Sequence, residues 1–281
     1  MRTVDTQQIQ ERVKELLLES SYNIGEKTFQ TLKQNYESET NVVSKSVLDQ
    51  IIKNDEIALN ENIPMCQDTG MAVIFLEIGQ EVHFIGENLY DSINNGVREA
   101  YNTGYLRKSV VDDPLFDRIN TKDNTPSIIH TDIVPGNKVK ITVAPKGFGS
   151  ENMSAIKMLK PSDGVKGLKD FIIQTVKNAG PNPCPPIVLG IGIGGTFEKC
   201  AYMAKKALTR EIGQHNKSEK YSNLEKELLE EINKLDIGPA GLGGKTTALA
   251  VHIEYFPTHI AGLPVAVNLC CHAYRHNFDI I

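Results

Sequence analysis

Long apolar runs, an excess of basic residues and tryptophan are all missing from this sequence of 281 residues. No apolar stretch approaches the roughly 20 residues that a membrane-spanning helix needs, and the N-terminus leads into a charged amphipathic segment rather than an apolar signal region. Acidic residues outnumber basic ones by 35 to 30 and form no tail, so neither a nucleic-acid groove nor a membrane-binding patch is indicated. We therefore predict a cytoplasmic protein that binds no nucleic acid and no membrane. The lack of tryptophan excludes nothing.

Cysteine is scarce as well, with five residues, an odd number. In the reducing compartment predicted above, such a set argues against a disulfide framework and leaves packing, catalysis or metal binding. No repeat or low-complexity segment interrupts the chain, and its most polar piece, residues 215–221, is a short connection between helices. We therefore expect a single catalytic domain over residues 1–281.

Hydrophobic periodicity predicts helices, which fill the first quarter of the chain. Ile9, Val13, Leu16 and Leu17 recur at helical spacing, and a longer helical stretch is broken at a polar segment. The expected helices after the first cover residues 27–60 with a break near 37–40, then 89–102, 164–178, 197–212 and 221–235.

Short apolar runs rich in β-branched residues predict strands between these helices. The expected strands cover residues 71–78, 127–132, 138–144, 187–191, 247–256 and 263–269. The second and third are joined by Pro135-Gly136-Asn137, typical turn residues, so we expect a hairpin. The fold class is therefore α/β, with mixed sheets flanked by helices and a helical N-terminal quarter.

Three segments place a cysteine among glycine or proline next to an apolar strand. They are residues 64–70 (PMCQDTG), 181–186 (PNPCPP) and 268–275 (NLCCHAYR). Prolines on both sides of Cys184 fix backbone angles and remove amide donors, so this thiol is presented on a rigid loop. A buried, inert cysteine is the ordinary alternative for any one position, but the joint pattern favours a metal site.

The spacing of these cysteines favours iron–sulfur chemistry over zinc. Structural zinc sites and electron-transfer ferredoxins draw their ligands in close groups, whereas Cys184 comes 118 positions after Cys66 and Cys271 comes 87 positions after Cys184. Three dispersed thiolates suggest a cluster with one iron left without a protein ligand. Such an iron is a Lewis acid that can help a hydroxy acid to lose water.

Four motifs in order resemble the α-type catalytic domain of class I fumarate hydratases and L-tartrate dehydratases. They are residues 66–70 (CQDTG), 146–152 (KGFGSEN), 184–186 (CPP) and 238–247 (GPAGLGGKTT). The resemblance extends from about residue 10 to the C-terminus, and four ordered motifs are far more specific than one glycine-rich piece. It implies a [4Fe–4S] hydro-lyase acting on a small dicarboxylate.

The resemblance implies cluster ligands at Cys66, Cys184 and a cysteine near the C-terminus. The family pattern C-x-A-x-R selects Cys271 over its neighbour Cys270, with the reverse choice as the alternative. Cys200 lies on a helical pattern, and we expect it to pack in the core.

The resemblance also implies contacts with substrate. Gln67 and Asp68 follow a cluster ligand directly, and we predict a substrate-binding role for the first and a catalytic role for the second. A turn cap is the alternative for Asp68, because Asp-Thr-Gly is good turn chemistry. Arg107 matches a family arginine expected to hold a substrate carboxylate, with a solvated surface charge as its alternative.

Two glycines and one histidine complete the predicted site. Gly147 and Gly149 could bring backbone amides close to an anion, although glycine is also ordinary at a strand-to-helix turn. His259 corresponds to a family active-site histidine, and we predict a catalytic role for it. His252 lies within an expected strand and is predicted to be a core residue.

Two glycine-rich runs superficially resemble nucleotide-binding turns. Residues 190–196 read G-x-G-x-G-G rather than G-x-G-x-x-G, and residues 243–247 lack the upstream spacing of a phosphate loop. We therefore predict no nucleotide site.

No convincing proton-abstracting base is present in this chain. In the family, a β-type domain supplies a base and further carboxylate contacts, so we expect the α subunit of a two-subunit enzyme, in an α2β2 or similar oligomer. The substrate stays open between fumarate or malate and L-tartrate, which differs from malate by one hydroxyl. Two alternatives are a non-catalytic iron–sulfur binding or sensing module and a protein whose buried thiols bind no metal.

Overall fold

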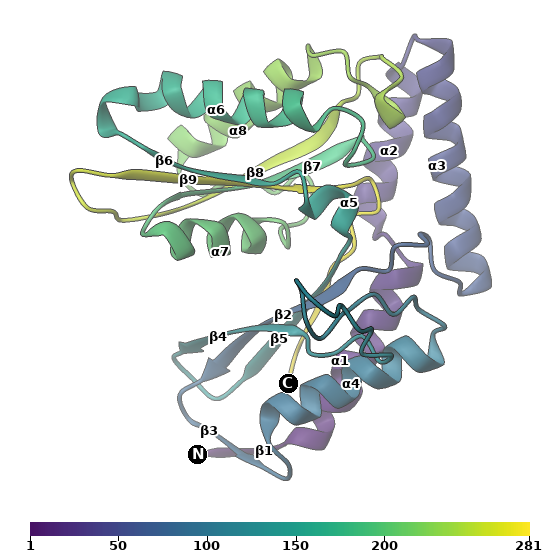
Figure 1. Ribbon diagram of the computed structural model, residues 1–281, viewed down its shortest axis with the longest axis vertical. Helices are drawn as coiled ribbons and strands as arrows, with labels where there is room; N and C mark the ends of the chain where they lie inside the picture. The colour runs from purple at the N-terminus through teal and green to yellow at the C-terminus, as the bar shows by residue number, and fades with distance from the viewer. The chain divides into compact units, whose positions relative to one another are not determined.

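The computed structural model describes all 281 residues, which form two compact units built from interleaved segments (Figure 1). Unit 1 consists of Met1–Gly25, Asp55–Phe148 and Arg275–Ile281, and unit 2 consists of Glu26–Asn54 and Gly149–Tyr274. Because the chain leaves and re-enters each unit, no single linker marks a boundary in the sequence. The expectation of one catalytic domain over residues 1–281 stays a prediction.

Unit 1 contains a mixed four-stranded sheet in the order β10-β5-β2-β4 and a separate parallel pair, β1-β3. Two helices cover one face of the sheet. The elements of this unit are α1 (Thr6–Tyr22), α4 (Leu89–Thr103), β1 (Arg2–Asp5), β2 (Met71–Gly79), β3 (Val82–Ile85), β4 (Ile128–Val134), β5 (Val139–Lys146) and β10 (Asn277–Ile280). The expected first helix, the helix at 89–102 and the strand at 71–78 are confirmed.

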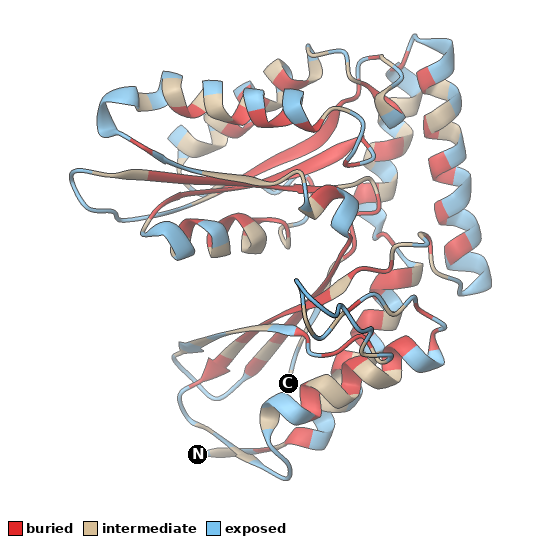
Figure 2. Ribbon diagram, viewed as in Figure 1, coloured by how far each residue is buried: buried red, intermediate tan, exposed pale blue.

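The core of unit 1 lies between the helices and one face of the sheet. Ile9, Val13, Leu16 and Leu17 on α1 are all buried there, together with alternate residues of β2 and β5. This alternation follows from the two-residue period of a strand. Figure 2 shows buried residues along most of the length of both strands. The helix begins at an N-cap, Asp5, whose side chain accepts a hydrogen bond from a first-turn amide.

The hairpin expected from residues 127–132 and 138–144 is wrong, because β2 lies between the two strands. β2 pairs in parallel with β4 and antiparallel with β5. Residues 72–76 of β2 are apolar and buried throughout, a pattern typical of a strand inside a sheet whose two faces are both covered. The connection from β4 to β5 crosses the end of β2, where a Cβ on Gly79 would lie 2.4 Å from the Gly136 carbonyl oxygen.

Unit 2 contains a mixed four-stranded sheet in the order β6-β9-β7-β8, with α6 and α8 on one face and α7 on the other (Figure 1). Helix α3 contributes residues to both units. The elements are α2 (Glu26–Ser38), α3 (Val42–Glu61), α5 (Phe148–Glu151), α6 (Gly164–Ala179), α7 (Phe197–Ala207), α8 (Glu219–Asn233), β6 (Ala155–Leu159), β7 (Ile187–Gly194), β8 (Ala248–Phe256) and β9 (Leu263–Cys270), with 3-10 turns at Pro161–Asp163 and Pro239–Gly241. The break expected near 37–40 is confirmed.

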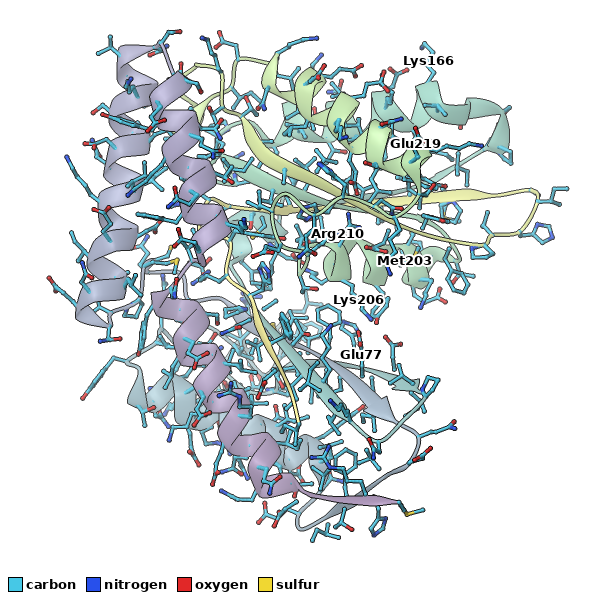
Figure 3. The ribbon with its side chains drawn as sticks, turned by 180° about the vertical axis from the view of Figure 1, so that it is seen from behind. Glu77, Lys166, Met203, Lys206, Arg210 and Glu219 are labelled. Carbon is cyan, nitrogen blue, oxygen red and sulfur yellow. The ribbon has the colours of Figure 1, made fainter.

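Helix α7 ends five residues earlier than the predicted range of 197–212. Leu208 and Arg210 donate their amides to carbonyls three residues back, which closes tight turns instead of continuing an α-helix. The Arg210 side chain, labelled in Figure 3, then forms ion pairs with Glu225 on α8 and Glu254 on β8. This network fixes the end of α7 against the sheet and α8.

The glycines of β7 have a packing role. A Cβ on Gly190 would lie 2.1 Å from the Ala204 carbonyl oxygen, and one on Gly192 would lie 2.0 Å from that of Cys200. Glycine therefore allows α7 to approach the strand closely.

Backbone amides of residues 243–247 already donate hydrogen bonds within the protein. Gly244 donates its amide to an Asp236 carboxylate oxygen at 2.7 Å, and Lys245 donates to Glu39 at 2.8 Å. Amides bound to carboxylates are not arranged to receive phosphate. No helix in the structure combines the length and apolar character that crossing a membrane requires.

Candidate active site

The turn Cys66–Gly70 leads into β2 and is fixed by two buried side chains of unit 1. The Tyr101 hydroxyl lies 2.9 Å from the carbonyl oxygens of both Thr69 and Gly70, and the Asn124 side-chain amide donates to Gly70 at 3.1 Å. Burial raises the pKa of Tyr101 well above its usual value, so its hydroxyl keeps its proton and remains a donor.

Asp68 joins this turn to the motif at residues 146–152. One carboxylate oxygen accepts the Gly70 amide at 3.1 Å, and the other accepts the Phe148 amide at 2.8 Å. A Cβ on Gly147 would lie 3.0 Å from the second oxygen, so glycine lets the chain pass close to the carboxylate. Asp68 therefore caps a turn, which is the alternative role given for it above, and it also links two motifs. Its catalytic role stays a prediction.

Arg107 is attached to the same turn through its backbone. The Thr69 hydroxyl donates to the Arg107 carbonyl oxygen at 3.0 Å, while the Arg107 side chain is exposed and forms no hydrogen bond or ion pair. Gln67 is exposed and Cys66 is half-buried. Unit 1 thus brings the segments that carry Cys66, Gln67, Asp68, Arg107 and Gly147 into one region.

In unit 2, the loops that carry Cys184 and Cys271 lie side by side. The amide of His272 donates to the Cys184 carbonyl oxygen at 3.3 Å. The pairing of Val188 with Cys270 explains this, because antiparallel β7 and β9 bring the start of one strand to the end of the other. Cys184 is exposed and has φ +56°, a left-handed conformation that non-glycine residues rarely adopt.

The two adjacent cysteines near the C-terminus differ in exposure. Cys270 ends β9 and is buried, whereas Cys271 lies just beyond the strand and is half-buried. Cys200 on α7 is fully buried, and this burial raises the pKa of its thiol. The expectation that Cys200 packs in the core is confirmed.

The structure does not bring His259 together with Cys184 and Cys271 within unit 2. His259 is exposed in the loop before β9, while Cys271 follows the end of that strand. Eight residues of strand span about 26 Å at roughly 3.3 Å per residue. The catalytic role of His259 stays a prediction. His252 is buried and its ring nitrogen contacts the Ala207 carbonyl oxygen, as expected for a core residue.

Gly149 lies near the Cys184 loop. The nearest atom to a Cβ built on Gly149 would be the Asn182 carbonyl oxygen at 3.6 Å. Glu151, two residues further along the same motif, accepts a hydrogen bond from Asn268 at 3.0 Å and forms an ion pair with Lys205. The unit 2 part of the motif, residues 149–152, is therefore anchored close to the end of β9.

Three residues that hold the unit 1 turn were not predicted from the sequence. Tyr101, Asn124 and Arg275 each donate a hydrogen bond to a carbonyl of residues 68–70. They lie far from that turn in the sequence, so no local pattern indicates that they hold it. The proximity of Arg275 to a candidate cluster cysteine was the one available signal.

The donor chemistry fits an iron–sulfur cluster. Each predicted ligand, Cys66, Cys184 and Cys271, lies outside the helices and strands, and none is fully buried. Loop thiolates are the donors that such clusters take. The structure contains no group of three or more His, Cys, Asp or Glu side chains arranged to hold a metal ion. Cys66 belongs to unit 1 and the other two to unit 2, so the complete ligand set stays a prediction.

Comparison with known proteins gives consistent matches along the chain. The family model described as Fumarate hydratase (Fumerase) matches residues 10–278. A protein of Methanocaldococcus jannaschii provisionally named L(+)-tartrate dehydratase subunit alpha is 44% identical over 271 residues, which cover 95% of each chain. The L(+)-tartrate dehydratase subunit alpha of Escherichia coli strain K12 is 35% identical over 248 residues, which cover 87% of this chain and 81% of that relative.

These matches and the mixed α/β fold define the class of the protein as a hydro-lyase. The chain belongs to the fumarate hydratase (Fumerase) family. The resemblance found in the four sequence motifs is thereby confirmed.

Proposed function

We propose that this chain is the α subunit of a [4Fe–4S] hydro-lyase that reversibly hydrates fumarate to L-malate. The observation that carries the proposal is the contact of two family motifs at Asp68, whose carboxylate accepts amides from both. The names of the relatives favour a second candidate, an L(+)-tartrate dehydratase α subunit that yields oxaloacetate. Malate and tartrate differ by one hydroxyl, so a modest change in the pocket would separate them.

We expect Cys66, Cys184 and Cys271 to hold the cluster as thiolates, with Cys270 as the alternative third ligand. When bound, the cluster supplies a Lewis acid for the departing hydroxyl. The burial of Cys270 and the greater exposure of Cys271 support this choice.

The remaining roles belong to side chains and amides of this chain. Arg107, with an exposed and unpaired guanidinium, is proposed to bind a substrate carboxylate, and Gln67 to orient the substrate by hydrogen bonds. Gly147 and Gly149 are proposed to bring backbone amides close to the same anion. Asp68 is proposed as a catalytic residue in contact with substrate, and His259 as one that acts only in the assembled enzyme.

The general base is proposed to come from a β-type subunit. Both relatives are named as alpha subunits, which supports a partner chain. An α2β2 or similar assembly is proposed for the complex. The decisive experiment is anaerobic co-expression with a β-type subunit of the same family, followed by assays with fumarate, L-malate and L-tartrate. We expect turnover of one substrate pair by the complex and none by this chain alone. Turnover by the isolated chain would contradict the need for a partner, and a cluster-bearing complex without turnover would favour the non-catalytic sensing module.

A further inference from the structure

Arg275 carries a buried positive charge whose hydrogen-bonding capacity is largely unused. Arg275 is only 4% exposed, and one of its terminal nitrogens, Nη2, donates to the Asp68 carbonyl oxygen at 2.8 Å. The other two nitrogens, Nε and Nη1, are buried and have no hydrogen-bond partner. A buried guanidinium with unpaired donors lowers the stability of a folded protein, so it calls for a compensating partner.

No acidic side chain of the protein supplies that partner. Asp68, whose backbone Arg275 contacts, directs its two carboxylate oxygens to the amides of Gly70 and Phe148. Arg275 forms no ion pair with any other carboxylate. A Cβ on Gly147 would lie 3.5 Å from Nη2 and 3.0 Å from an Asp68 carboxylate oxygen, so glycine keeps this side of the guanidinium clear of a side chain.

We propose that Arg275 binds a carboxylate of the substrate, as a second cationic contact besides Arg107. Buried polar groups in native proteins are hydrogen-bonded, and an anionic oxygen is the strongest acceptor for a guanidinium. A dicarboxylate presents two negative charges. The contact with the Asp68 carbonyl already orders Arg275, so little side-chain entropy remains to be lost on binding. This inference rests on the proposed function only for the identity of the ligand.

The test uses the full chain without its cluster and succinate as the probe, because succinate has two carboxylates and no hydroxyl to lose. Calorimetric titration compares the natural protein with Arg275→Gln and Arg275→Lys. The matched control is Arg98→Gln, which removes another unit 1 arginine that pairs with Asp123. We expect Arg275→Gln to weaken succinate binding by about tenfold or more, Arg275→Lys to weaken it less, and the control to match the natural protein.

Thermal unfolding without succinate separates binding from a purely structural role. Glutamine removes the unpaired buried charge at the cost of at most one hydrogen bond, so we expect Arg275→Gln to melt no lower than the natural protein. Equal succinate affinity in the natural protein and Arg275→Gln would overturn the proposal, as would an absence of succinate binding by the natural protein. If Arg275→Gln does not fold, natural affinity in folded Arg275→Lys would overturn it.

A third measurement separates the substrate from the cluster as the source of the anion. An altered electron paramagnetic resonance spectrum of reconstituted Arg275→Gln, with unchanged succinate binding, would assign the arginine to the cluster and overturn the proposal. Failure of the proposed function has a different signature. Succinate binding would still depend on Arg275, but the chain would take up no cluster or the co-expressed complex would not turn over.

Discussion

Cys184 occupies a backbone conformation that costs energy for a residue with a side chain. Its φ of +56° lies in the left-handed region, and its thiol is exposed rather than used in packing. Strain of this kind persists where the surrounding structure imposes it, and it is concentrated at functional sites. The geometry therefore suits a residue whose position matters more than its contribution to the core.

Removing the Cys184 thiol should abolish cluster assembly without unfolding the protein. We expect Cys184→Ala to retain less than about a tenth of the natural iron and sulfide content after anaerobic reconstitution, because an open loop offers no replacement thiolate. Absorbance and iron analysis provide the measurement. Cys200→Ala is the control, since that buried thiol should not affect the cluster. Equal iron in both variants would exclude Cys184 as a ligand.

His276 should make the protein less stable in mild acid. Burial lowers its pKa from 6.5 to about 4, so between these values the unfolded chain binds a proton that the folded chain does not. The contribution of His276 to the free energy of unfolding is then fully present above pH 6.5. It falls by up to about 3 kcal/mol as the pH approaches 4. Urea unfolding from pH 7 to 4.5 measures the loss, which His276→Gln should reduce. The exposed His83→Gln is the control, and an unchanged pH dependence in His276→Gln would contradict this assignment.

At the scale of secondary-structure elements, glycine sets the distance between α7 and β7. We expect Gly192→Ala to destabilise the protein by about 1–3 kcal/mol, because the added Cβ would lie 2.0 Å from the Cys200 carbonyl oxygen and push the helix away. Gly262→Ala is the matched control in unit 2, since its Cβ would meet nothing closer than 3.9 Å. Urea unfolding compares the two, and equal midpoints would disprove the packing role.

Elements with a strong internal pattern could be predicted from the sequence. Helix α1 and strand β2 carry long periodic or continuous apolar runs, whereas β1, β3 and β10 have four residues each and β6 has five, too few to show a period. Which strands pair with one another was harder to predict than the strands themselves. The turn residues between β4 and β5 are typical of a hairpin, but they cannot reveal that a third strand pairs between the two.

The residues of the candidate site likewise differ in how far the sequence could predict them. The motifs that contain Cys66, Asp68 and Gly147 could be found because they are local and chemically unusual. Tyr101 could not, and the pattern C-x-A-x-R contained Arg275 without indicating its contact with this turn, because such contacts arise only when distant segments meet. His259 shows the opposite difficulty. Its separation in sequence from Cys271 is small, but an eight-residue strand lies between them.

At the scale of the whole molecule, the interleaved segments make each unit depend on distant parts of the chain. Residues 26–54 belong to unit 2 but precede the rest of it by almost a hundred residues. Glu39 is 3% exposed and accepts the Lys245 amide at 2.8 Å, and Asn35 contacts the Thr246 hydroxyl at 3.1 Å. The glycine-rich loop at 243–247 is therefore held by the N-terminal segment of its unit.

A fragment of residues 149–274 should consequently lack a stable fold. Without the Glu39 carboxylate, the Lys245 amide loses its part-buried hydrogen bond, and the faces covered by the missing helix residues become exposed to water. We expect the fragment to melt without a cooperative transition, as measured by circular dichroism, and co-expression with residues 26–54 to restore cooperative melting. Co-expression with residues 26–54 carrying Glu39→Ala is the control and should restore it less. A fragment that melts cooperatively by itself, at the temperature of the full chain, would show that residues 26–54 contribute nothing to the stability of unit 2.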